Sequence, residues 1–129
     1  MNNKAYVADA HAIAYYLRGS LPTDADKAFR QVEREEGTMC FPAIALAEII
    51  YVFEKTKKRE RIWEMFNKID EYPTFLIHPL GEQVLKMVPE IELNELHDRI
   101  IVATSKLVKA KLVTKDKEIQ KSDIIETIW

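Results

Sequence analysis

The sequence predicts an α/β fold with a central, mostly parallel sheet flanked by helices. Short apolar runs alternate with longer segments of helical periodicity along the 129 residues, and this alternation is typical of such sheets. The hydrophobic content of 47% suits one compact domain, expected to span residues 1–129, with its own core. The sequence contains no internal repeat and no low-complexity tract that would indicate another architecture.

The first half of the chain is expected to begin with two strands and two helices between them. The apolar segment 5–8 predicts a short buried strand, and the helix that follows it stops at Gly19. Pro22 opens a charged helix that is expected to run to about Glu36, where Gly37 breaks it. The further elements expected in this half are a strand at 38–41 and helices at 43–55 and 58–70.

The second half is expected to continue the alternation. The strongest helix is 96–109, in which apolar residues recur at helical spacing as a buried stripe. The other expected elements are a strand at 75–80, a short helix at 81–88, a strand at 111–114, one helical turn at 117–120 and a strand at 124–129. Ligands of such sheets bind beyond the carboxyl ends of the strands. Asp9 ends the first strand and Asp116 lies just past a later one, so both are expected near that edge.

Four acidic residues interrupt apolar stretches at strand–helix junctions or on helices beside them: Asp9, Glu48, Asp98 and Asp116. A lone carboxylate in apolar surroundings is costly unless a cation compensates it. Two carboxylates about 4 Å apart repel by roughly 4 kcal/mol at an effective dielectric of 20. Mg²⁺ or Mn²⁺ prefers oxygen ligands and would relieve that repulsion. Such ions also activate water and stabilise a leaving oxygen, so this chemistry requires no side-chain nucleophile.

Each of these acids has a simpler alternative. Asp9 could cap the helix that begins near Ala10, and Asp116 could be a turn residue after a strand. Glu48 could reach solvent from one edge of its helix, and Asp98 could cap its helix or pair with a basic residue of the same helix. The order of the four, each in a suitable context, favours a common site.

The chain as a whole is not strongly basic, but it contains two basic segments. The net charge is −2, while lysines and arginines gather at 55–61 and again at 106–121, around Asp116. These segments could be solvated surfaces or could contact phosphates. In the second segment, Lys115 and Lys117 flank Asp116 and are candidate substrate-binding residues.

Other classes of site find little support. Cys40 is the only cysteine, so neither an intrachain disulfide nor a cysteine cluster for zinc is possible. No segment predicts a signal peptide or a membrane span, and we expect a cytoplasmic protein with no membrane partner. A phosphatase-like domain that uses Asp9 as phospho-acceptor is disfavoured, because His11 stands where the second acid of a DxD signature would be.

Three segments resemble the PIN-domain ribonucleases, notably the VapC-type toxins of toxin–antitoxin pairs. VADAHAIAYYL is similar to the family's opening strand, acidic residue and first helix. HDRIIVATSK followed by KLVTKD resembles the family's helix–strand–Thr-x-Asp segment and is the more specific match. The resemblance covers essentially the whole chain and implies a PIN-like three-layer sandwich.

The resemblance also implies an activity, a cofactor and partners. Asp9, Glu48, Asp98 and Asp116 would be the catalytic, metal-binding acids, and Thr114 would be the small hydroxyl residue near the last acid, where it would contact the substrate. The expected function is Mg²⁺- or Mn²⁺-dependent endonucleolytic cleavage of RNA by a homodimeric toxin that a small antitoxin inhibits. The alternative is a non-catalytic PIN-like module that binds RNA or protein. Many relatives carry Thr or Ser directly after the first acid, and this chain has Ala10 there.

Overall fold

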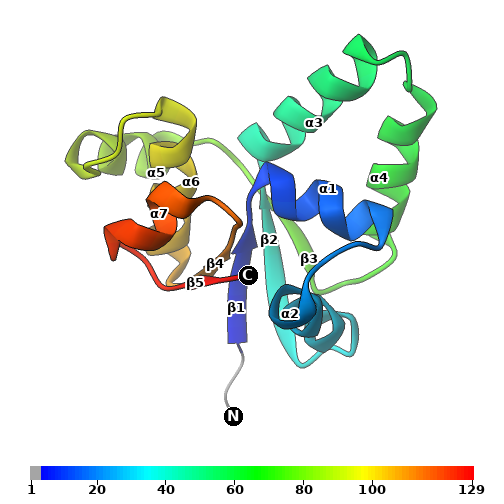
Figure 1. The fold of residues 1–129 in the computed structure, drawn as a ribbon, viewed down its shortest axis with the longest axis horizontal. Coiled ribbons are helices and arrows are strands. Elements are labelled where there is room, and N and C mark those ends of the chain that lie inside the picture. The colour runs from blue at the N-terminus through cyan, green and yellow to red at the C-terminus, as the bar shows by residue number, and fades with distance from the viewer. Residues whose placement is uncertain (1–3) are drawn as a thin grey trace.

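The structure, a computed structural model that describes residues 4–129, contains one five-stranded sheet (Figure 1). The strands are β1 (Lys4–Ala8), β2 (Gly37–Pro42), β3 (Phe75–His78), β4 (Lys111–Val113) and β5 (Thr127–Ile128). Their order is β3-β2-β1-β4-β5, and every neighbouring pair is parallel. The predicted α/β class is therefore confirmed, and β1 is the central strand.

Helices cover both faces of the sheet. They are α1 (Ala10–Arg18), α2 (Thr23–Glu33), α3 (Ala43–Lys55), α4 (Glu60–Asp70), α5 (Glu82–Met87), the 3₁₀ helix η1 (Val88–Glu90), α6 (Leu96–Val108) and α7 (Lys117–Ser122). Figure 1 shows α1 to α4 on one side of the strands and α5 to α7 on the other. From β1 the chain adds β2 and β3 toward one edge of the sheet, and it then returns to add β4 and β5 toward the other edge. Because each crossover is right-handed, the reversal of direction places the later helices on the opposite face.

Several boundaries differ from the predicted ones. Helix α2 ends at Glu33, and Gly37 is the first residue of β2 and not the residue that breaks the helix. A Cβ atom at Gly37 would lie 2.6 Å from the backbone oxygen of Lys4, so the close pairing of β1 and β2 requires glycine there. Strand β5 is limited to Thr127–Ile128, shorter than the predicted 124–129.

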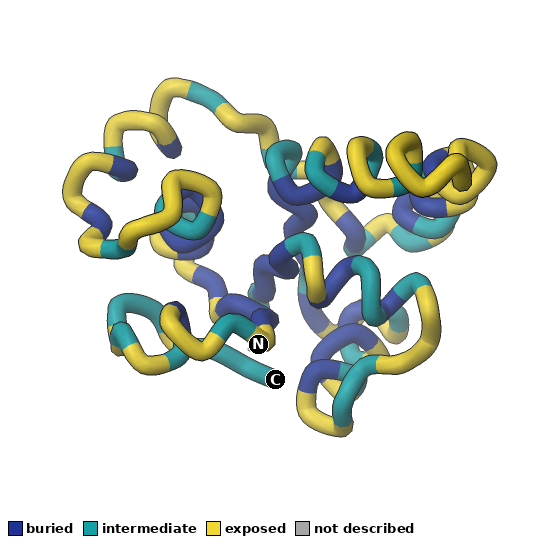
Figure 2. The backbone as a smooth tube through the Cα atoms, turned by 45° about the horizontal axis from the view of Figure 1, so that its top comes forward, coloured by how far each residue is buried: buried dark blue, intermediate teal, exposed yellow. Residues whose placement is uncertain are grey.

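The core lies between the sheet and the two helical layers, as the buried tube segments in Figure 2 show. The largest fully buried side chains include Phe29, Phe41 and Ile13, on α2, β2 and α1. The face of α3 that packs on the core contains Ala45, Leu46 and Ile49. In the described part of the chain, residues 4–129, no helix combines the length and apolar character that a bilayer span requires.

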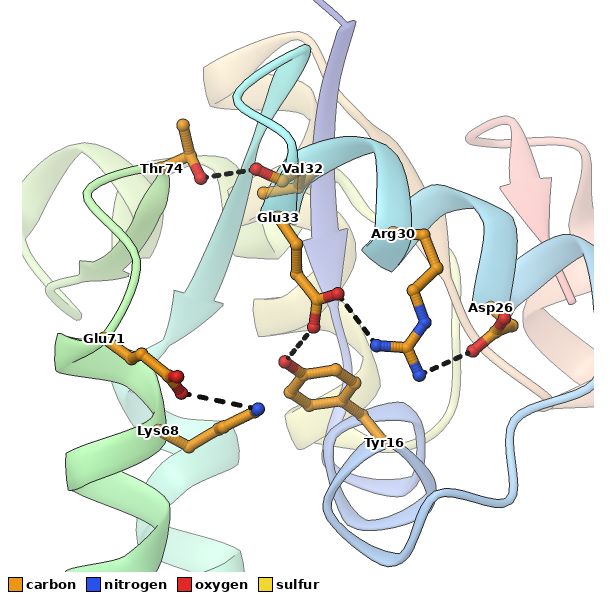
Figure 3. A network of polar contacts seen from close by, with 8 residues as sticks. All are labelled: Tyr16, Asp26, Arg30, Val32, Glu33, Lys68, Glu71 and Thr74. Atoms are coloured by element: carbon orange, nitrogen blue, oxygen red, sulfur yellow. Dashed lines mark hydrogen bonds and ion pairs between the residues drawn. The ribbon is translucent and has the colours of Figure 1, made fainter.

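A polar network joins α1 to α2 (Figure 3). The Tyr16 hydroxyl donates to Glu33 at 2.6 Å, and Arg30 donates to the same carboxylate at 2.8 Å. Burial acts to raise the pKa of Glu33, but the hydrogen bonds from Tyr16 and Arg30 outweigh it and lower that pKa. Arg30 also pairs with Asp26 at 3.3 Å. The network therefore joins the last turn of α1 to α2.

Candidate active site

The four predicted acids lie on four elements that meet at the carboxyl edge of the sheet. Asp9 follows β1, and Asp116 follows β4, two residues past Thr114. Glu48 lies on α3, which leaves the end of β2, and Asp98 lies in the first turn of α6. Because β1, β2 and β4 are parallel neighbours, the segments that leave their ends start at the same edge of the sheet (Figure 1).

Asp9 is a buried carboxylate, only 8% exposed, and both of its oxygens accept hydrogen bonds. Oδ1 accepts from the backbone nitrogen of Ala12 at 2.9 Å, which makes Asp9 the N-cap of α1. Oδ2 accepts a hydrogen bond from the Thr114 hydroxyl. Burial raises the pKa of Asp9; the two hydrogen bonds oppose this rise, and the nearby Asp116 carboxylate adds to it. The capping alternative is therefore correct for Asp9 and does not remove it from the acidic group.

Thr114 is fully buried and connects two of the acids. Its hydroxyl donates to Asp9 and accepts from the backbone nitrogen of Asp116 at 3.0 Å. Its backbone oxygen accepts from Gln120 at 2.9 Å. The substrate contact predicted for Thr114 stays a prediction. In this structure its hydroxyl is buried, and its two hydrogen bonds position Asp9 and the backbone of Asp116.

Asp116 caps the next helix in the same way. Its Oδ1 accepts from the backbone nitrogen of Ile119 at 2.9 Å at the start of α7. Asp9 and Asp116 therefore each use Oδ1 to accept a hydrogen bond from the backbone nitrogen three residues later. This capping fixes the positions of Asp9 and Asp116 beside β1 and β4.

Asp98 lies on α6, on the side of the sheet opposite α1 and α3 (Figure 1). It makes no side-chain cap to its helix and, within residues 4–129, no ion pair. Burial raises the pKa of Asp98 to about 6, and the carboxylates of Asp116, Glu95, Glu118 and Asp9 contribute to the rise in that order. The predicted alternatives of helix capping or pairing with a basic neighbour therefore do not describe Asp98.

Glu48 is half-buried and pairs with His97. The Nδ1 atom of His97 lies 3.2 Å from a carboxylate oxygen of Glu48. Burial raises the pKa of Glu48, His97 opposes the rise, and Asp9 adds to it. Ile44 and Tyr51, also on α3, line a small hollow with this pair. The only signal for His97 in the sequence is that it adjoins Asp98.

The acids form one electrostatically coupled group whose donors are all oxygens. Asp9 interacts with Asp116, Asp98 interacts with both, and Glu48 interacts with Asp9. This chemistry and this accumulated negative charge fit a hard divalent cation. Among residues 4–129, no group of three or more His, Cys, Asp or Glu side chains is arranged to hold one metal ion.

The basic candidates lie beside Asp116. Lys115 is exposed, and its Nζ donates to the hydroxyl of Tyr15 at 3.0 Å. Lys117 is exposed at the first position of α7. A hollow of about 1080 Å³ lies elsewhere: Lys4 and Lys111 line it at the starts of β1 and β4, the edge opposite the acids.

Comparison with known proteins identifies the family. The PIN domain family model matches residues 6–124, nearly the whole chain. No curated protein matches the sequence. Several solved structures share the fold. A chain of VapBC2 from Rickettsia felis, bound to a promoter DNA fragment, has a TM-score of 0.76 at 16% identity over 95% of this chain and 96% of that one. A chain of DNA-bound VapBC from Salmonella typhimurium has a TM-score of 0.75 at 16% identity over 96% of both chains. FitAcB from Neisseria gonorrhoeae gives a TM-score of 0.71 at 17% identity over 95% of both chains. The chain belongs to the PIN domain family.

Proposed function

We propose that the protein is a Mg²⁺- or Mn²⁺-dependent endoribonuclease, a single nuclease domain that acts as the toxin of a toxin–antitoxin pair. The observation that carries the proposal is the coupled group of Asp9, Glu48, Asp98 and Asp116. Burial and mutual repulsion raise the pKa of Asp9, Glu48 and Asp98. Carboxylates gathered at such a cost are typical of cation sites.

The chain's own residues divide the remaining tasks. The four acids would hold the ion, and a bound divalent ion supplies an activated water and stabilises the leaving oxygen. Thr114 orients Asp9 and fixes the backbone of Asp116. Lys115 and Lys117 would hold the RNA backbone. No protein nucleophile is indicated at Ser105, because this side chain is fully buried and donates to Ile101.

A cleavage assay tests the proposal. Purified protein should cut single-stranded RNA at internal positions with Mg²⁺ or Mn²⁺, and a chelator should stop the reaction. Asp98→Asn should reduce the rate by at least about 100-fold, whereas Asp24→Asn, an exposed acid on α2, should leave it unchanged. Full activity of the Asp98 variant at saturating metal would exclude Asp98 from the site.

The alternative function is a non-catalytic PIN-like module, and one observation favours it. Among the described residues, no group of three or more His, Cys, Asp or Glu side chains is arranged to hold a metal ion. A module of this kind would bind RNA without cutting it under any divalent ion. The same assay, combined with a binding measurement, separates the two functions.

The partner proposal rests on a groove between α1, α3 and α4. The groove has a volume of about 590 Å³, and its apolar residues include Leu17, Phe53 and Met65. The basic side chains on its lining are Arg18, Arg30, Lys58, Arg61 and Lys68, against the single acid Glu64. We propose that an amphipathic antitoxin helix with acidic residues occupies it. A toxin–antitoxin complex from Klebsiella pneumoniae also shares the fold: one of its chains has a TM-score of 0.64 at 19% identity over 92% of this chain and 93% of that one.

Self-association is proposed from the exposed apolar side chains. Tyr51 is 64% exposed and Trp63 is 70% exposed, on α3 and α4. Leu76 and Ile77 are exposed on the edge strand β3. We propose that part of this surface forms a two-fold contact in a homodimer. Light scattering at micromolar concentrations should give a dimer mass, and a monomer throughout would exclude the contact.

A further inference from the structure

Two cations are held by one aromatic ring beside the candidate active site. The guanidinium carbon of Arg18 lies 4.6 Å from the centroid of the Tyr15 ring, and the Nζ of Lys115 lies 5.0 Å from it. The same Nζ donates to the Tyr15 hydroxyl at 3.0 Å. The ring of Trp129 packs edge-on against Tyr15 at 5.3 Å. These four residues, the Tyr15 cluster, come from α1, from the segment after β4 and from the segment after β5.

The cluster leaves both cations available to an anion. Within the described residues 4–129, neither Arg18 nor Lys115 pairs with a carboxylate, whereas Arg30 and Lys111 each do. An aromatic face attracts a cation through its quadrupole and does not neutralise the charge. Tyr15 therefore restricts the positions of two positive charges that remain free to bind a phosphate.

The position of the cluster relates it to the four acids. Lys115 lies in the chain between Thr114, whose hydroxyl donates to Asp9, and Asp116. Tyr15 lies on α1, the helix that Asp9 caps. A backbone bound at the cluster would thus lie next to the strand ends that carry the acids. The acids repel phosphate, and two fixed cations near them would offset that repulsion for an RNA backbone.

We propose that the Tyr15 cluster is a phosphate-binding site for single-stranded RNA, in which Tyr15 positions Arg18 and Lys115. The proposal rests on the proposed function, since it names how the substrate of that site is held. The alternative is a purely structural role, in which Tyr15 only packs against Trp129. In that case Arg18 and Lys115 would not contribute to RNA binding.

RNA binding measured in a chelator, so that no cleavage occurs, tests the cluster. The probe is a fluorescently labelled oligouridylate, and the readout is the dependence of the dissociation constant on salt concentration. Arg18→Ala and Lys115→Ala should each lower the log–log salt slope by up to about 0.7, the value per contact for single strands. Lys86→Ala, an exposed lysine on α5 away from the cluster, should leave the slope unchanged.

Variants of Tyr15 separate positioning from anchoring. Tyr15→Leu leaves the charge unchanged and should weaken binding several-fold in the native protein. The same change should have no effect when Arg18 and Lys115 are already alanine, because the ring then has no cation to position. Tyr15→Phe, which keeps the ring and the fold, should give a smaller loss through the missing hydroxyl bond to Lys115. Should Tyr15→Leu fail to fold, equal binding by Tyr15→Phe and native protein would overturn the proposal.

The remaining outcomes distinguish this site from the proposed function. Unchanged salt slopes in the Arg18 and Lys115 variants, or an equal effect of Tyr15→Leu in both backgrounds, would overturn the cluster even if metal-dependent cleavage is observed. Slopes that fall as expected in a protein that cuts RNA under no divalent ion would support the cluster and refute the nuclease.

Discussion

Replacing Asp98 by asparagine should stabilise the protein while it abolishes RNA cleavage. Burial and neighbouring carboxylates raise the pKa of Asp98 from its ordinary value of 3.8 to about 6. Because every tenfold change in proton affinity is worth about 1.4 kcal/mol, this difference corresponds to about 3 kcal/mol. Asp98 is half-exposed, and solvent screening reduces the amount to roughly 1 kcal/mol. For a chain of this size, that gain corresponds to a rise in Tm of roughly 3–5 °C.

The sign of the pH dependence follows from the raised pKa. A carboxyl group that binds its proton more tightly in the folded state stabilises the fold below its unfolded pKa of 3.8. This contribution is lost as the pH rises through about 6, where the folded group ionises. The advantage of Asp98→Asn over the native protein should therefore be full at pH 8 and absent below about pH 4.

Thermal melting in a chelator, repeated from pH 4 to pH 8, measures this advantage. Glu54→Gln, which removes an exposed carboxylate from α3, is the matched control and should show no comparable gain. A variant at Asp98 that is less stable than the native protein at pH 8 would refute the reasoning. A gain of the same size at every pH would also refute it, because repulsion between carboxylates requires their ionisation.

Two further predictions concern the other acids and their support. Divalent ions should raise the Tm of the native protein in proportion to the logarithm of their concentration, and the double variant Asp9→Asn, Asp116→Asn should lose this rise; a rise that persists would place the ion elsewhere. Thr114→Val should cost about 1–3 kcal/mol in urea unfolding, because Asp9 loses a buried hydrogen-bond donor, and Thr114→Ser should restore most of it.

The sequence predicted the fold well because the signals were local and mutually consistent. Strands and helices alternate with clear periodicity, and the glycine at position 19 ends α1 in the left-handed conformation, with φ of 69°. Gly37 misled the prediction, since a glycine after a charged helix is typical of a helix end. Glycine is required at position 37 because the backbone of Lys4, on the neighbouring strand, lies too close for a side chain. Lys4 is 33 residues away in the sequence, so no local pattern could indicate this contact.

The site could be predicted only as a set of residues and not as a geometry. The order of the acids indicated a common site, and this stays a prediction; what the structure adds is that Asp116 contributes to the raised pKa values of Asp9 and Asp98. The burial of the Thr114 hydroxyl depends on the packing of β4 against β1, so the sequence alone could not indicate it. The Glu48–His97 pair joins two helices that are far apart in the sequence, so no spacing rule could have indicated it.

Local backbone bonding and membership of an acidic group are compatible roles for Asp9 and Asp116. Each residue uses Oδ1 to accept a backbone hydrogen bond in the first turn of a helix. Capping therefore fixes each carboxylate at the carboxyl end of a parallel strand, where the positive end of the helix dipole partly offsets the repulsion from the neighbouring acids. Asparagine is an equally good N-cap, whereas alanine loses about 1 kcal/mol of helix stability. Substitution by asparagine is consequently the change that removes the charge of these acids and keeps the fold that positions them.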